Sequence, residues 1–115
     1  MEQFMLIVRE DLARIGRLTD EERFSSSPDM GEWVNSLMDR GLYITGTPLG
    51  IEGRYVSQDQ VLFDGPFITA SEGISGFDLI WAEDLEQATE IAQNCPMVKI
   101  GHCIREVRQV VALPE

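Results

Sequence analysis

The chain has few of the side chains from which metal centres, disulfide frameworks and nucleic-acid surfaces are built. Its 115 residues include two cysteines, one histidine and nine basic residues against 20 acidic ones, for a formal net charge of −11. Two cysteines and one histidine give neither a disulfide framework nor a metal-ligand spacing, so we expect reduced thiols and no metal or cofactor. Nucleic acids and anionic membranes attract lysine and arginine, so we expect neither as a partner.

Long apolar runs and targeting segments are missing too. No run approaches the roughly 18 residues that cross a bilayer, and the start, Met1 to Phe4, lacks the basic region and long apolar core of a signal peptide. Glycine-rich phosphate loops and a serine nucleophile elbow are also absent. The hydrophobic content of 43% is ordinary for a globular protein. We therefore expect one cytoplasmic domain over residues 1–115.

Apolar periodicity predicts two main helices and several strands. The first helix has apolar residues three and four apart from Met30 to Met38, and Gly41 stands where a helix-ending glycine is expected. The second opens at Asp84 and ends before Pro96. Extended segments are predicted at residues 4–8, 42–45, 60–63, 74–82 and 104–111, with a hairpin or loop over 49–56.

The polar segment before the first helix leaves two alternatives. Thr19 to Glu22 has the Thr-x-x-Glu form of a capping box, which marks a helix start. Pro28 then either begins the main helix or kinks a longer one that starts near Thr19.

The element order predicts a ferredoxin-like α+β fold. The order is β-α-β-β-β-α-β, or β-α-β-β-α-β with one extra strand, and its two helices would cover one face of an antiparallel sheet. The second face would stay uncovered. Burying it against a twin subunit is the economical solution, so we expect a homodimer with twofold symmetry.

The sharpest local signal is a corner after the strand that ends at Phe63. Asp64 accepts local backbone hydrogen bonds, Gly65 allows positive φ, and Pro66 fixes φ and removes a donor. Phe67 follows at once. This order predicts a carboxylate held on a rigid corner beside an aromatic ring.

Short motifs occur in order over nearly the whole chain. They are Phe4-Met5-Leu6-Ile7, Glu32-Trp33, Gly46 with Leu49, Asp64-Gly65-Pro66-Phe67, Glu72, Gly76-Phe77, Glu90 with Ala92, Cys95-Pro96, Gly101 and Arg108. The ordered set resembles the DGPF branch of the YCII-related superfamily, which contains small dimeric α/β-barrel proteins. The resemblance implies a dimeric barrel built from the ferredoxin-like α+β fold.

The chain departs from that family pattern in three places. Family members often carry Glu-Thr-Lys-Glu after the corner, whereas this chain has Thr69 to Glu72 without the first carboxylate or the lysine. Arg108 stands one residue late, which predicts a β-bulge in the last strand. Some relatives are thought to use a His–Asp pair with the histidine in the N-terminal half. This chain has no histidine there, so that mechanism does not transfer.

Three side chains are candidates for proton transfer. Asp64 is either a general base or ligand anchor, or the Asx turn that shapes the corner. Glu72 is either a second carboxylate facing Asp64 or a loop residue that caps backbone N–H groups. His102, the only histidine, either faces a cleft opposite Asp64 or lies on the surface.

Aromatic and basic side chains supply the candidate ligand contacts. Phe67, Trp33, Trp81 and Arg108 are predicted to bind a small organic ligand, with core or interface packing as the alternative for the aromatic rings. Two functions follow. The protein either binds a small molecule in a cleft between sheet and partner and catalyses a lyase-like or hydrolytic proton transfer, or it is a non-catalytic binding or accessory module.

Overall fold

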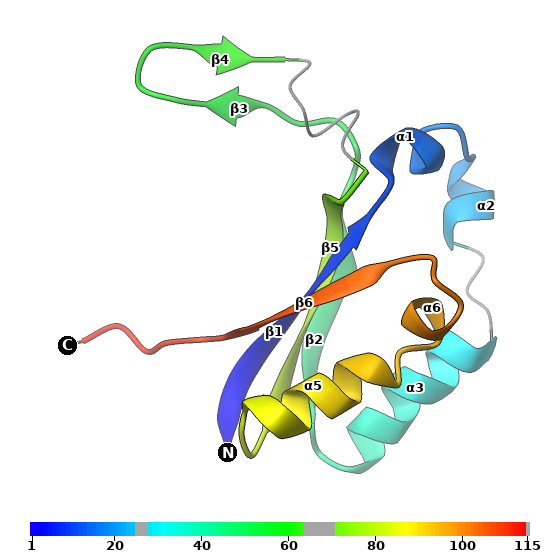
Figure 1. The fold of residues 1–115 in the computed structure, drawn as a ribbon, viewed down its shortest axis with the longest axis vertical. Coiled ribbons are helices and arrows are strands. Elements are labelled where there is room, and N and C mark those ends of the chain that lie inside the picture. Colours follow the sequence, from blue (N-terminus) through cyan, green and yellow to red (C-terminus); the bar gives the residue numbers. More distant parts are fainter. Residues whose placement is uncertain (25–27, 64–70, 115) are drawn as a thin grey trace.

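A four-stranded antiparallel sheet forms the centre of the fold (Figure 1). The computed structural model describes residues 1–24, 28–63 and 71–114. The strand order is β2-β5-β1-β6, with bounds β1 Glu2–Glu10, β2 Tyr43–Pro48, β5 Gly73–Ala82 and β6 Ile104–Gln109. Neighbouring strands are antiparallel throughout. The predicted mixed α+β class is confirmed, and the described strands form an open sheet rather than a closed barrel.

Two longer helices pack on one face of this sheet. They are α3, Pro28–Asp39, and α5, Leu85–Gln93, in agreement with the two predicted main helices. Three short helices accompany them: α1 Leu12–Ile15, α2 Asp20–Phe24 and α6 Pro96–Lys99. In Figure 1, α1 and α2 lie near one end of the sheet, whereas α3, α5 and α6 lie together nearer the other end.

The helix ends follow the local sequence signals. Thr19 Oγ1 accepts from the Glu22 backbone N–H at 3.0 Å, and the Thr19 N–H donates to Glu22 Oε1 at 2.9 Å, so the capping box is confirmed. Asp84 caps α5 by accepting from the Gln87 N–H at 2.8 Å. Gly41 has a φ of 70° after α3. The junction between α2 and α3, residues 25–27, lies outside the described residues.

The hydrophobic core lies between the sheet and the two main helices. Alternation along β1 points Phe4 and Leu6 toward the helices, and both side chains are fully buried. Full burial of such a side chain stabilises the fold by about 1.5–3 kcal/mol. The other buried members of this cluster are Trp33, Leu37, Leu42, Ile80, Ala82, Ala88, Ile91, Ala92 and Cys95.

The opposite sheet face is apolar and lies away from both main helices. Met5 pairs with Leu79, and Ile7 pairs with Phe77, so these four half-buried side chains lie together on that face. On β6, Arg108 pairs with Met5 and is exposed. This side of the sheet is therefore an apolar surface with a charged edge.

Two predictions about the strands need correction. The segment over 60–63 does not join the main sheet: β4, Val61–Leu62, pairs with β3, Tyr55–Val56, in a hairpin that stands apart (Figure 1). The last strand carries no bulge over Ile104–Gln109, because its register with β1 is continuous. The register shifts lie instead in the pairings of β5 with β1 and with β2. A search of the described helices finds none long and apolar enough to cross a membrane.

Candidate functional site

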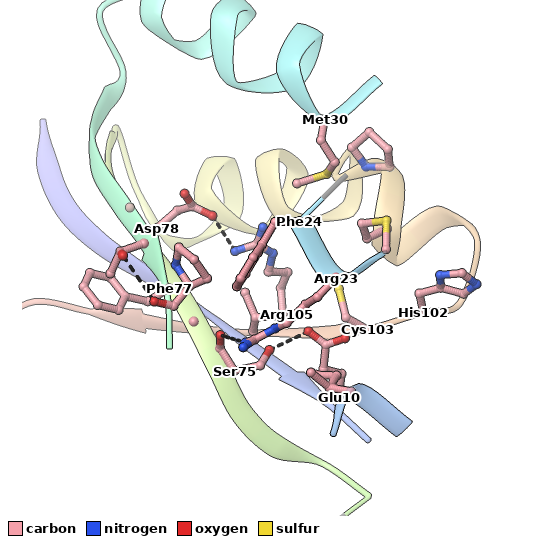
Figure 2. Close-up of a pocket in the computed structure, with 18 of the residues that line it drawn as sticks. Glu10, Arg23, Phe24, Met30, Ser75, Phe77, Asp78, His102, Cys103 and Arg105 are labelled. Atoms are coloured by element: carbon pink, nitrogen blue, oxygen red, sulfur yellow. Dashed lines mark hydrogen bonds and ion pairs between the residues drawn. The ribbon is translucent and has the colours of Figure 1, made fainter. Parts of the chain in front are cut away.

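A cavity of about 870 Å³ opens on the helix-covered face of the sheet, next to the start of α3. The strands supply its floor through Glu10, Ser75, Asp78 and Arg105, and the short helices supply its walls. Figure 2 shows Arg105 near the middle of the view, with His102 and Cys103 toward one side. The first turn of α3 adds Met30 to the lining, and α6 adds Pro96 and Met97.

Arg105 is the most deeply buried charge in this cavity. Its side chain is 4% exposed and its Nη1 lies 2.7 Å from Asp78 Oδ2, on a carboxylate that is 13% exposed. The same Nη1 donates to the Leu6 carbonyl at 3.2 Å. Arg105 Nε is buried and has no acceptor within the described part of the chain. A buried guanidinium N–H without an acceptor is costly, so this atom is a candidate point of ligand contact.

The Arg105 guanidinium also packs on an aromatic ring. It lies 5.2 Å from the centre of the Trp33 ring, a cation–π distance. Trp33 is itself fixed, because its Nε1 donates to the Ile91 carbonyl of α5 at 3.2 Å. Burial alone lowers the pKa of Arg105, but the negative charges of Cys95 and Asp78 outweigh that effect and raise the pKa. The guanidinium therefore stays charged at neutral pH.

Tyr43 completes a three-residue chain of hydrogen bonds. Its hydroxyl donates to Asp78 Oδ1 at 2.6 Å, while the other carboxylate oxygen holds Arg105. Burial and this hydrogen bond to Asp78 raise the pKa of the Tyr43 phenol, so the group is a donor at neutral pH. Gly46 makes the arrangement possible, since a Cβ at this position would overlap both the Tyr43 hydroxyl and Asp78 Oδ1.

A second polar group joins the floor to the short helices. Glu10 Oε2 accepts from the Ser75 hydroxyl at 2.5 Å, and Glu10 Oε1 forms an ion pair with Arg14 at 2.9 Å. Arg23 of α2 donates to the Leu49 carbonyl and, at 3.3 Å, to the Ser75 carbonyl. These contacts fix α1 and α2 against the end of the sheet and so hold one wall of the cavity.

The two cysteines differ in burial, and of the two only Cys103 is among the residues that line the cavity. Cys95 is fully buried and Cys103 is half-buried, and both are free thiols. Cys95 Sγ lies 3.7 Å from Arg105 Nη2. A hydrogen bond from Cys103, with a smaller effect of the Arg105 charge, lowers the pKa of the Cys95 thiol against the effect of burial, while the pKa of Cys103 is raised. The Arg105 guanidinium thus lies close enough to the Cys95 sulfur to favour a negative charge on it.

The cavity differs in charge from the molecule as a whole. Four of the nine basic residues line it, matched by four acidic ones, in a chain whose net charge is −11. The charged lining residues are Arg14, Arg23, Lys99, Arg105, Glu10, Glu22, Asp29 and Asp78. A small anion that would be repelled by the general surface meets a balanced field here.

The structure describes two of the three predicted proton-transfer residues, Glu72 and His102, and only His102 lines the cavity. Asp64 lies outside the described residues. Glu72 is exposed and is not among the residues that line the cavity; its backbone carbonyl accepts from Arg9 Nη1 at 2.9 Å. His102 does line the cavity and is exposed at its edge (Figure 2).

The predicted ligand contacts lie mostly away from this cavity. Phe67 lies outside the described residues. Trp33 is 8% exposed and belongs to the core, directly behind Arg105. Trp81 is half-buried on β5 and packs against the core. Arg108 is exposed and pairs with Glu106 at 3.1 Å.

The central group of Tyr43, Asp78 and Arg105 was not anticipated from the sequence. Its one visible signal is that Asp78 shares a strand face with buried Ile80. A carboxylate at such a position needs a partner, because a buried charge is strongly unfavourable alone. Identifying Arg105 as that partner requires the strand order, which places β1 between β5 and β6.

Comparison with known proteins identifies the family. A search of curated proteins finds no match to this chain. The family model for the YCII-related domain matches residues 3–111, which takes in the sheet except for Glu2, both main helices and every described residue of the cavity lining. The chain therefore belongs to the YCII-related family.

Proposed function

We propose that this protein binds a small organic molecule, bearing a carboxylate or similar acceptor group, in the cavity above Arg105. The observation that carries the proposal is the Arg105 Nε, a buried donor with no acceptor in the described part of the chain, on a residue that lines a cavity of about 870 Å³. An acceptor on the ligand would satisfy this donor. Charge-assisted hydrogen bonds of this kind are stronger than neutral ones.

The rest of the lining favours a ligand with an apolar body. Ile15, Leu18, Phe24 and Met30 contribute apolar side chains around the charged floor. Ligand sites commonly combine such walls with a few polar groups that set orientation, in volumes of roughly 300–1,000 Å³. A small aromatic or aliphatic acid fits this combination of an apolar wall and one buried cation.

Two versions of this function remain as proposals. In the catalytic version, His102 at the cavity edge exchanges a proton with the bound molecule in a lyase-like or hydrolytic step, with Asp64 or Glu72 as further candidates. Histidine is the side-chain type that most readily gains and loses protons near neutral pH. In the alternative, the protein binds its ligand without chemistry, and Tyr43 and Asp78 serve only to orient Arg105.

We also propose that the chain works as a homodimer, as a ferredoxin-like member of the DGPF branch. The support is the apolar sheet face of Met5, Ile7, Phe77 and Leu79, which lies away from both main helices. Pairing two such faces would bury them and complete an α/β-barrel across two subunits.

Benzoate, an acid with an apolar ring, is a suitable probe for the cavity. We expect its titration into ¹⁵N-labelled protein to shift the amide signals of cavity residues, Ser75 and Arg105 among them. Benzamide has a similar shape without the charge, so it should bind more weakly. Arg105→Lys should weaken benzoate binding by about tenfold or more, because lysine lacks the planar fork of donors.

Arg108→Lys is the matched control, since Arg108 is an exposed arginine on the same strand. It should leave benzoate binding unchanged. If benzoate and benzamide bind equally, or if both arginine variants weaken binding to the same extent, the assignment of an anion-binding cavity at Arg105 is wrong.

A further inference from the structure

Arg23 is a positioned cation in the lining of the cavity. Its Nη2 donates to the Leu49 carbonyl and, at 3.3 Å, to the Ser75 carbonyl, and its guanidinium lies 4.8 Å from the centre of the Phe24 ring. Both carbonyl contacts use Nη2, which leaves the Nε and Nη1 donors of the guanidinium for a ligand. Because these contacts already hold the side chain, a ligand that binds it pays little further ordering cost.

Arg23 also has no carboxylate partner in the described part of the chain. In the same lining, Arg14 forms an ion pair with Glu10, and Arg105 forms one with Asp78. The partners of Arg23, in contrast, are two neutral carbonyl groups. In a chain with a net charge of −11, a cation of this kind favours the entry of a small anion into the cavity.

Arg23 and Arg105 are both held on strand β5. Arg23 contacts the Ser75 carbonyl, and Arg105 Nη1 lies 2.7 Å from Asp78 Oδ2. Ser75 and Asp78 are three residues apart on this strand. A strand rises about 3.3 Å per residue, so the backbones of the two anchoring residues lie roughly 10 Å apart. A chain of a few carbon atoms with an acidic group at each end fits this spacing.

Lys99 is the other lining cation that has no carboxylate partner among the described residues. It is exposed on α6, whereas Arg23 is half-buried. A long exposed side chain loses rotamer freedom when it contacts a ligand, and Arg23 is already fixed. The contacts therefore favour Arg23 over Lys99 as a second point of anion binding.

We propose that the cavity binds a dicarboxylate, with one carboxylate at Arg105 Nε and the other at the Arg23 guanidinium. This inference rests on the proposed binding of an acid at Arg105 and adds a second acidic group to the ligand. Phe24 and Met30 line the same cavity and supply apolar contacts for the carbon chain between the two ends. Both ends form charge-assisted hydrogen bonds, which are stronger than neutral ones.

Isothermal titration calorimetry with the straight-chain dicarboxylates from succinate to suberate tests this inference. Each dicarboxylate is compared with the monocarboxylate of the same carbon number. We expect an intermediate length to bind at least about tenfold more tightly than its monocarboxylate, because two linked contacts gain most when the linker matches the span. Succinate is the shortest of the series and should show little advantage.

Substitutions at Arg23 identify the second contact. Arg23→Gln removes the charge and keeps a donor for the two carbonyls, so the advantage of the best dicarboxylate should fall to about twofold or less. Arg23→Lys keeps the charge without the planar fork and should retain part of the advantage. Arg17→Gln is the matched control, because Arg17 is exposed and is not among the lining residues. It should retain the advantage in full. Circular dichroism establishes that each variant is folded.

The outcomes separate this inference from the proposed function. If the monocarboxylates bind but no dicarboxylate binds more tightly, or if the advantage persists in Arg23→Gln, the second contact is overturned and acid binding at Arg105 stands. If the advantage is lost in Lys99→Gln instead, the second carboxylate lies at α6 and its assignment to Arg23 is wrong. If neither kind of acid binds, the proposed function fails, and this inference fails with it.

Discussion

Arg105 of β6 and Asp78 of β5 form an ion pair of 2.7 Å that spans β1, the strand between them. The guanidinium crosses the β1 backbone, where the Leu6 carbonyl accepts a further hydrogen bond. Three strands are therefore joined by one side chain, in addition to the backbone hydrogen bonds of the sheet. The same side chain forms the centre of the cavity floor, so the residue that fixes the sheet also sets the chemistry of the site.

Removal of the Arg105 charge should destabilise the protein strongly. Arg105→Met leaves the Asp78 carboxylate largely buried with Tyr43 as its remaining partner. Breaking a buried ion pair from one side typically lowers the free energy of unfolding by about 3–5 kcal/mol. Urea unfolding followed by circular dichroism measures the change.

Arg108→Met is the control for that substitution. Arg108 is on the same strand, but its side chain is 69% exposed in its pair with Glu106, and exposed pairs contribute about 0–1 kcal/mol. Equal losses in the two variants would mean that the pair of Arg105 with Asp78 has no special role in stability.

Gly46 is expected to tolerate no side chain. In Gly46→Ala the new Cβ would overlap the Tyr43 hydroxyl and Asp78 Oδ1, so the chain of hydrogen bonds must shift. Such overpacking lowers the free energy of unfolding by about 1–3 kcal/mol. Thermal and urea unfolding give the value. On a Tyr43→Phe background the loss should be smaller, because the hydroxyl that the Cβ meets is gone.

Gly50→Ala is the matched control for Gly46→Ala. A Cβ at Gly50 meets no atom within 4 Å, so we expect a change within about 0.5 kcal/mol. If both alanine variants lose the same stability, the effect is one of glycine in general and not of the close approach at Gly46.

Local signals in the sequence predicted the two main helices and the start of α2, but not the short helices α1 and α6. Thr19 with Glu22, Asp84 with Gln87, and Gly41 each act within a few residues, and each has the predicted geometry. Such hydrogen bonds depend on residues that are neighbours in the chain, so a single sequence is enough to recognise them.

The cavity could not be predicted in the same way. Asp78 and Arg105 are 27 residues apart in sequence, and they meet only because β1 is inserted between their strands. Cys95 Sγ lies 3.7 Å from Arg105 Nη2, a contact between the end of α5 and β6 that neither local sequence reveals. The Asp64 corner, the strongest motif in the sequence, lies outside the described residues, so its role stays a prediction.

The open sheet face predicts a dimer that a single charge should break. Light scattering at micromolar concentration should give twice the chain mass of 13.0 kDa. Leu79→Glu places a carboxylate among Met5, Ile7 and Phe77, and its burial in a dimer interface would leave the charge without a partner. This variant should be monomeric.

Met38→Glu is the control, because Met38 is 58% exposed on α3, away from that face, and it should stay dimeric. Far-ultraviolet circular dichroism establishes that both variants are folded. A monomeric unmodified chain would contradict the pairing of sheet faces, and a dimeric Leu79→Glu variant would place the interface on another surface.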